Sequence, residues 1–385
     1  MKAGSWPSIA LIYLYGVLAS AGLSKIIPLQ GDYESMLGIG HAQFSLLLSL
    51  IAIPPAVLAA AAGSIIDRIG PRTALIAAAV VGLCVNFAYL QARSLPAFQI
   101  IRAFEGFVMV GAYSGAPALI MATTSPERRA RAMAFWSTYT PVGIATGLLL
   151  SASFAGTSQW RGGYLLHLVL FGLLALAGLL LPRAPRAPHA RPAGLLAAWT
   201  QKGPLRLSLT FGMLVMMGFG LNMVFPSWYS QQHDVTMGSA SRLLAMSNLA
   251  MIPGGFLAGM LLSRGIRDLR LLWLLMALSV LVSVPLLMAG GSSVLRLGAL
   301  ISWQLMAGAA IAVVTSGLPR VVSDPRQGAA AAGLLSQIAA LVTFVTPLIW
   351  SPILASGWWP GFLLVLLAAA AAASLLFPAT RSAPK

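Results

Sequence analysis

Apolar stretches of about 20 residues follow one another along the whole chain, and short polar or Gly/Pro-rich joints separate them. A helix of that length rises about 30 Å, which is the thickness of the hydrocarbon core of a bilayer. The pattern therefore predicts an all-α membrane protein with twelve transmembrane helices. The predicted helices span residues 6–29, 42–64, 72–92, 97–122, 132–155, 162–182, 206–230, 240–263, 270–291, 297–320, 329–355 and 360–378.

A proline-rich joint divides the sixth predicted helix from the seventh. Its sequence is PRAPRAPHARP, residues 182–192. Proline recurs about every third residue and supplies no backbone N–H, so this joint cannot be helical and should be a stiff linker. We expect an N-terminal six-helix bundle over residues 1–182, a cytoplasmic linker over 183–205 and a C-terminal six-helix bundle over 206–385.

The two predicted bundles resemble each other in sequence. GSIIDR at 63–68 closes the second predicted helix, and GMLLSR at 259–264 closes the eighth, at an offset of 196. SPERRARA at 125–132 and SDPRQGAA at 323–330 both lead into an odd-numbered helix. Two matches at similar offsets predict a duplicated, pseudo-symmetric pair of bundles, as in transporters built from repeats.

Composition agrees with the membrane assignment, and the distribution of charge adds an orientation. Hydrophobic residues make up 58% of the chain and charged residues 8%, with a mean hydropathy of +0.87, whereas soluble proteins carry about 25% charged residues. A net charge of +16 would suggest nucleic acid as the partner of a soluble protein. Here 18 of the 24 Lys and Arg residues lie near the termini or in the loops that follow even-numbered predicted helices. By the positive-inside rule both termini face the cytoplasm, and we expect an integral protein of the bacterial cytoplasmic (inner) membrane with no nucleic-acid partner.

The stretch GSIIDRIGPR at 63–72 resembles the signature G-x-x-x-D-R-x-G-x-R/K of the major facilitator superfamily. The resemblance implies a secondary transporter in which two six-helix bundles rock about a midplane site, and in which this loop latches the cytoplasmic side. The residues that carry it are Gly63, Asp67, Arg68, Gly70 and Arg72.

Each residue of this loop also has a physical reading. Gly63 would let the second helix approach a neighbour closely, and Gly70 would permit a tight turn. Asp67 could lie against the positive N-terminus of the eleventh helix, while Arg68 and Arg72 face anionic lipid headgroups. The alternative is that these arginines only set the topology.

The fourth predicted helix carries a second match and an internal ion pair. IIRAFEGFVMVGA at 100–112 resembles the family's helix 4 pattern through Arg102, Gly106 and Gly111. Arg102 and Glu105 stand at i and i+3, within reach of each other, and a charge at membrane depth costs at least about 2.5 kcal/mol without a partner or a cavity. Glu105 is the only acid placed well inside a predicted helix. Glu105 either carries protons, with Arg102 modulating its pKa, or forms with Arg102 a static ion pair that braces predicted helices 1 and 4.

Polar and aromatic residues elsewhere are candidates for a substrate cavity. By the family resemblance, helices 1, 4, 7 and 10 line the pathway. Lys25 either lines the same cavity as Arg102 or snorkels to the outer surface, and His167 is a packing histidine or a proton carrier. The full set of cavity candidates is Lys25, Arg102, Trp136, Tyr139, Asn222, Trp303 and Gln304.

Enzyme chemistry finds little support. The chain has one cysteine, no H-E-x-x-H and no G-x-x-x-x-G-K-[ST], so we expect no metal site, no cofactor and no bound ATP as energy source. The predicted function is proton-coupled transport of a small organic molecule by a monomer that contacts substrate, protons and membrane lipid. Export of a drug or siderophore-like metabolite is favoured.

Two alternatives remain open. Uptake of a small organic or inorganic anion fits the excess of Lys25 and Arg102 over Glu105. It also fits TPVGIATG at 140–147, where Thr140 stands in place of the glycine of the family's antiporter pattern. The second alternative, from another class, is a membrane-embedded enzyme or receptor.

Overall fold

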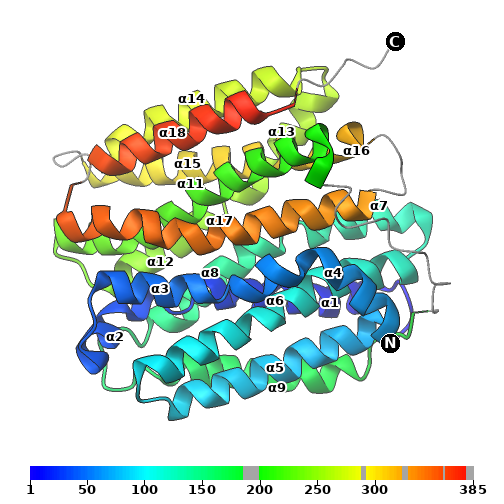
Figure 1. The fold of residues 1–385 in the computed structure, drawn as a ribbon, viewed down its shortest axis with the longest axis horizontal. Coiled ribbons are helices and arrows are strands. Elements are labelled where there is room, and N and C mark those ends of the chain that lie inside the picture. Colours follow the sequence, from blue (N-terminus) through cyan, green and yellow to red (C-terminus); the bar gives the residue numbers. More distant parts are fainter. Residues whose placement is uncertain (185–198, 288–291, 323–327, 359, 379–385) are drawn as a thin grey trace.

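The structure is a computed structural model that describes residues 1–184, 199–287, 292–322, 328–358 and 360–378. Over these residues the chain is helical apart from turns and short connections, without any strand. The helices lie side by side along one direction (Figure 1). The first helix begins and the last one ends at the same end of the molecule, which we call the terminal end; the opposite end is the far end (Figure 1).

The elements divide into two halves. The first half contains α1 (Trp6–Ser24), the 3-10 turn η1 (Ile27–Leu29), α2 (Gln30–Leu37), α3 (His41–Leu50), α4 (Ile53–Ile69), α5 (Pro71–Gln91), α6 (Leu95–Thr123), α7 (Pro126–Trp136), α8 (Tyr139–Ala152) and α9 (Gly162–Gly178). The second half contains α11 (Lys202–His233), α12 (Met237–Asn248), α13 (Met251–Ser263), α14 (Asp268–Leu287), α15 (Ser293–Ser316), α16 (Leu318–Val321), α17 (Gly328–Ser356) and α18 (Pro360–Leu376).

Most of these helices are suited to crossing a membrane. In the described part of the chain nine helical stretches are long and apolar enough to do so, and α9 and α18 are shorter apolar helices. Each of the twelve predicted segments overlaps one of these stretches or the α7–α8 pair. The helix that follows the linker begins at Lys202, earlier than predicted, and most of the predicted linker lies outside the described residues.

Four predicted helices are interrupted, and proline explains each break. The interruptions fall at 51–52, 137–138, 249–250 and 317, and Pro54, Pro141, Pro253 and Pro319 follow them. Each proline leaves the carbonyl one turn earlier without its helical N–H partner. The first predicted helix also ends early, at Ser24, and continues as η1 and α2.

Two of these breaks are packed in the same way in the two halves. A Cβ on Gly106 of α6 would lie 2.2 Å from the backbone oxygen of Ile51, and a Cβ on Gly308 of α15 would lie 2.0 Å from that of Met251. Only glycine allows so close a helix contact. This shared packing supports the pseudo-symmetry of the halves, and it makes Gln304 the counterpart of Arg102, each four residues before its glycine.

The halves are joined at the far end. One core of buried apolar side chains extends from the second half into the far end of the first, through residues such as Tyr33 and Phe98. The terminal end of the first half has a separate core, which includes Ile12 and Leu119. At the far end, a Cβ on Gly238 of α12 would lie 2.4 Å from the backbone oxygen of Ala152. The described structure is therefore closed between the halves at the far end.

Candidate functional site

Three charged side chains meet inside the first half, and we call them the charged cluster: Lys25, Arg102 and Glu105. Nζ of Lys25 lies 2.5 Å from Oε1 of Glu105, and Nη1 of Arg102 lies 2.7 Å from Oε2. At most 4% of each side chain is exposed. Lys25 follows the last turn of α1, while α6 places Arg102 and Glu105 one turn apart on one face. The pair foreseen in the sequence thus has a third member.

Neighbouring groups of the first half complete the hydrogen bonding of the cluster. Lys25 donates to Oδ1 of Asn86 at 2.7 Å, and the Tyr89 hydroxyl donates to Oε2 of Glu105 at 3.0 Å. The same ammonium lies 4.6 Å from the centre of the Tyr89 ring and 5.2 Å from that of Tyr164, where cation–π attraction compensates for lost water. Lys25 therefore does not snorkel to the surface, and its contacts are with α5, α6 and α9.

Arg102 also binds the backbone of α1. Its guanidinium donates to the carbonyl oxygens of Gly22 at 2.6 Å and Leu23 at 3.3 Å. A Cβ on Gly22 would lie 3.2 Å from Oε1 of Glu105, so α1 lies directly over the carboxylate. In this conformation the cluster holds α1 to α6.

Charge in the cluster does not balance. Two cations share one carboxylate, so the cluster carries one surplus positive charge when all three groups are ionised. The second half has no equivalent, since Gln304 and Ala307 stand where Arg102 and Glu105 stand in the first. The cluster is thus a feature of the first half alone.

His167 lies close to this cluster. It is fully buried, Nδ1 bonds the Gly163 carbonyl oxygen at 2.8 Å, and the charges of Lys25 and Glu105 act on its ring. Its Nε2 has no hydrogen-bond partner among the described residues. It is therefore not a fully satisfied packing histidine.

The aromatic cavity candidates of the first half lie together. The rings of Trp136 and Tyr139 stack at 4.3 Å, and Tyr139 lies 5.1 Å from the ring of Tyr113. These rings pack against α1 at Gly16, where a Cβ would lie 2.5 Å from the Trp136 ring. Trp136 is buried, while Tyr113 and Tyr139 are half-buried. We call these three residues the aromatic wall: Tyr113, Trp136 and Tyr139.

The candidates of the second half are buried among its own helices. Oδ1 of Asn222 accepts a hydrogen bond from Asn248 at 2.9 Å, which ties α11 to the break between α12 and α13. Trp303 and Gln304 of α15 are each 1% exposed. Trp303 Nε1 and Gln304 Nε2 find no hydrogen-bond partner among the described residues.

The loop over 63–72 takes a different form from the one expected. Gly70 has φ 86°, a conformation that favours glycine. Gly63, however, has no described atom within 4 Å of a Cβ built on it, so the expected close helix contact there is wrong for this conformation. The side chain of Asp67 lies outside the described residues, and Arg68 is exposed.

Arg72 contacts the end of another helix. Its Nη2 donates to the Leu179 carbonyl oxygen at 2.6 Å and its Nε to that of Gly178 at 3.3 Å. These carbonyls lie at the C-terminal end of α9, where the Gly178 oxygen also accepts the Leu181 N–H at 3.1 Å, so Arg72 caps that helix. Asp268 and Arg320 form a further ion pair at 2.8 Å, joining α14 to α16 in the second half.

Several contacts were missed from the sequence alone. Tyr89 and Tyr164 contact the charged cluster, although in sequence they look like ordinary aromatic residues of apolar helices. The available signal was spacing, because Tyr89 follows Asn86, and Tyr164 precedes His167, by one helical turn. Asp268, as the first residue of α14, could be taken for an N-terminal helix acid.

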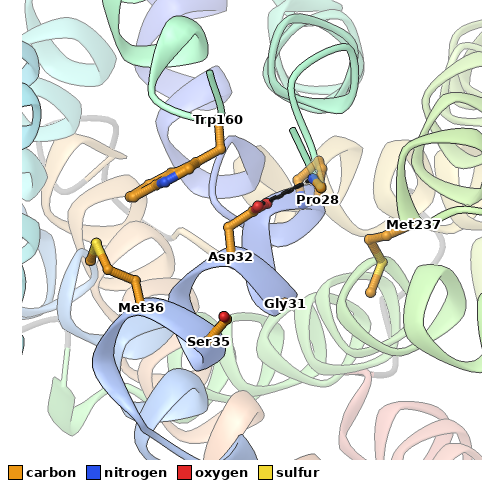
Figure 2. A pocket seen from close by; sticks show the side chains of 8 residues that line it. Pro28, Gly31, Asp32, Ser35, Met36, Trp160 and Met237 are labelled. Carbon is orange, nitrogen blue, oxygen red and sulfur yellow. Dashed lines mark hydrogen bonds between the residues drawn. The ribbon is translucent and has the colours of Figure 1, made fainter. Parts of the chain in front are cut away.

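A pocket of about 420 Å³ lies at the far end. Figure 2 shows Asp32 between Trp160 and Met36 on one side and Met237 of the second half on the other. The Asp32 carboxylate accepts the backbone N–H of Gly156 at 3.0 Å. Across the described residues, no group of three His, Cys, Asp or Glu side chains could hold a metal ion.

Comparisons with known proteins agree with this architecture. The family model described as Major Facilitator Superfamily matches residues 9–347. No curated protein sequence matches the chain. A bacterial homolog of the human lysosomal transporter Spinster, solved inward-facing and unoccupied, superposes with a TM-score of 0.74 at 16% identity, over 99% of this chain and 100% of that one.

Two further solved structures give similar values. A bacterial Spinster homolog, inward-facing and occupied, has a TM-score of 0.72 at 16% identity, over 97% of this chain and 97% of that one. A mutant of the nucleoside transporter NupG has a TM-score of 0.73 at 15% identity, over 96% of this chain and 100% of that one. At such identities the likeness concerns the fold.

Proposed function

Since this chain belongs to the major facilitator superfamily and is a secondary transporter rather than an enzyme, we propose that it exports a small organic molecule in exchange for protons. The observation that carries the proposal is the charged cluster. A carboxylate buried at membrane depth is costly unless it has firm partners or faces a cavity, and that of Glu105 joins two helices through Lys25 and Arg102.

Glu105 is proposed as the proton carrier. Its carboxylate neutralises part of the charge of Lys25 on α1 and of Arg102, which itself binds α1 through Gly22 and Leu23. Protonation of Glu105 would remove the negative charge from this junction and loosen α1 from α6. Because α1 also packs against α8 through Gly143 and Gly147, such a change would reach the helix that contacts α12 of the other half.

The aromatic wall is proposed as part of the substrate site. Tyr113 and Tyr139 offer half-buried ring faces and hydroxyls, which suit a small organic molecule better than an inorganic ion. In the second half we place Asn222, Trp303 and Gln304 on the same pathway, where the free donors of Trp303 and Gln304 would bind polar groups of the substrate.

A second candidate function is uptake of a small anion together with a proton. It is favoured by the surplus positive charge of the cluster, since an anionic group near Lys25 and Arg102 would balance it. Protonated Glu105 would leave both cations free for that anion. Proton and anion would then move in the same direction.

We assign the far end to the outer side of a bacterial cytoplasmic membrane and both termini to the cytoplasm. The α4–α5 turn, the start of α11 and the end of α13 lie toward the terminal end (Figure 1). They carry Arg68, Arg72, Arg206 and Arg264, in accord with the positive-inside rule. On this assignment the halves, divided by the linker over 183–205, are closed toward the outer side. The latch of Gly63, Asp67 and Arg68 would form only when the protein faces outward. We propose a monomer with lipid around it.

The test uses the purified protein in liposomes that contain a pH-sensitive dye. Compounds are first selected by thermal shift, because a ligand of the folded state raises its apparent stability. Accumulation of a compound into liposomes with an acidic lumen indicates exchange against protons, whereas accumulation with an alkaline lumen indicates co-transport. The first result supports export and the second supports anion uptake.

Glu105→Gln then separates coupling from binding. We expect it to abolish accumulation driven by a pH gradient while leaving exchange of labelled for unlabelled compound. Gradient-driven accumulation equal to that of the original protein would remove Glu105 from the mechanism. Glu127→Gln serves as control, because it makes the same replacement at an exposed carboxylate outside the charged cluster and the latch.

A further inference from the structure

A hydrogen bond crosses between the halves at the far end. The hydroxyl of Ser227 on α11 donates to Oε1 of Gln30, the first residue of α2, at 3.0 Å. Both residues are buried, with 6% of Gln30 and 3% of Ser227 exposed. The bond lies where the halves share one core, so it must break if the far end opens.

The other end of the Gln30 amide is held by a carboxylate. Its Nε2 donates to Oε1 of Glu34, one turn further along α2, at 2.8 Å. This contact fixes the orientation of the amide, because the carboxylate accepts only from the NH₂ side. The carbonyl side of Gln30 is thereby directed at Ser227.

Glu34 in turn contacts a histidine of the next helix. Nδ1 of His41, at the start of α3, lies 2.5 Å from the same Oε1 and 2.8 Å from Nε2 of Gln30. Two acceptors cannot approach to that distance, so a proton lies between Nδ1 and Oε1, and Nε2 of Gln30 donates to Oε1 rather than to Nδ1. The side chains of His41 and Glu34 are 33% and 25% exposed, and water can reach this pair while Gln30 stays buried.

We propose that Gln30 closes the far-end gate, and that Glu34 and His41 position its amide so that opening depends on the pH at the far end. The gate has a biological role only if the protein is a transporter as proposed, but its test measures a distance between the halves and does not depend on transport. An imidazolium forms an ion pair with Glu34, while a neutral imidazole forms only a hydrogen bond. Acid should therefore hold Glu34, and through it the Gln30 amide, more firmly.

The other charged side chains of α2 and α6, which pack against α3, are already engaged. Asp32 of α2 binds the Gly156 N–H, and Arg102 and Glu105 of α6 belong to the charged cluster. The helix α17, which packs along α3, has no titratable side chain over 330–356, and α3 itself has only His41. Glu34 is thus the partner through which His41 acts.

The test measures the width of the far end in the full-length protein. Spin labels are placed on cysteines at the exposed positions Ser158, in the first half, and Gln232, in the second, after Cys84→Ser. Pulsed electron resonance then gives the populations with short and long distances at about pH 5.5 and about pH 8, the interval in which histidine changes charge.

Loss of one hydrogen bond between neutral groups should raise the open-to-closed ratio about two- to tenfold. We expect this increase for Gln30→Ala and for Ser227→Ala, and no increase for Gln91→Ala, which removes an exposed glutamine of α5. Ser227→Ala removes the same hydrogen bond by replacing its donor. If one of the two variants fails to fold, the other still tests the gate.

The pH response tests the positioning pair. In the protein that carries only the spin-label substitutions, the population with the long distance should be larger at about pH 8 than at about pH 5.5. His41→Gln and Glu34→Gln should each remove that difference. Distances in Gln30→Ala and Ser227→Ala equal to those in Gln91→Ala would overturn the gate. An unchanged pH difference in His41→Gln would overturn the role of the pair. Both results are independent of whether protons drive transport.

Discussion

Lys25 and Arg102 bind opposite oxygens of one carboxylate, that of Glu105, at 2.5 and 2.7 Å. Both cations are fully buried, and they belong to different helices, α1 and α6. The loss of each side chain should therefore have unequal consequences. Without Glu105 two buried cations face each other, whereas without Lys25 a balanced pair remains.

Glu105→Gln is expected to lower the free energy of unfolding by about 3–5 kcal/mol, because it leaves buried cations without a counter-charge. Lys25→Met keeps the Arg102–Glu105 pair and a chain of similar length, so it should cost clearly less. Thermal unfolding of the two purified variants in the same detergent measures the order. A lower melting temperature for Lys25→Met than for Glu105→Gln would contradict this account.

Gly106→Ala and Gly308→Ala should both destabilise the protein. The added methyl group would lie about 2 Å from the Ile51 or Met251 backbone oxygen, so the helices must separate, which costs about 1–3 kcal/mol. Gly259→Ala is the matched control, since a Cβ there has no described neighbour within 4 Å. Its melting temperature should stay the same or rise slightly, because alanine favours helix.

Arg72→Gln should destabilise the first half by about 1 kcal/mol, because it removes the charged cap from the end of α9. The control is Arg68→Gln, an exposed arginine of the same loop, which should leave stability unchanged. Thermal unfolding of both variants distinguishes a helix cap from a topology signal. Equal melting temperatures for the two would show that the cap at Gly178 and Leu179 adds no stability.

The sequence was sufficient for the fold class because the length of a hydrophobic segment is a local signal. Segments of membrane-spanning length predicted the helices, and the motif over 63–72 indicated the family whose model matches residues 9–347. The helix breaks were missed although Pro54, Pro141, Pro253 and Pro319 mark them, because a proline near a helix start and one inside a helix look alike in sequence.

The site was only partly predictable, since its contacts join distant helices. The pairing of Arg102 with Glu105 followed from their spacing on one helix. The third partner, Lys25, comes from α1, and two outcomes, snorkelling or burial, fitted its position equally well. Nothing in the sequence indicated that Gly63 would face open space, because that depends on the conformation of the two halves.

Gly63→Ala offers a test of the proposed latch that is separate from stability. In the present conformation a Cβ at Gly63 meets no described atom within 4 Å, so the melting temperature should not fall. If the latch packs Gly63 closely when the protein faces outward, the same methyl group should slow transport in liposomes several-fold by disfavouring that state. Asp67→Asn should act in the same direction, and normal turnover in both variants would rule out the latch.

The Asp268–Arg320 pair should stabilise the terminal end of the second half, where Ser263 stands in place of the acid of the first-half motif. Arg320 is half exposed, at 49%, so the interaction should contribute about 1 kcal/mol or less. Asp268→Asn and Arg320→Gln should each lower the melting temperature slightly, and the double variant should cost less than the sum of the two. A double variant that is strictly additive would mean that the 2.8 Å contact stabilises nothing. The exchanged pair, Asp268→Arg with Arg320→Asp, should recover part of the loss if charge attraction is the cause.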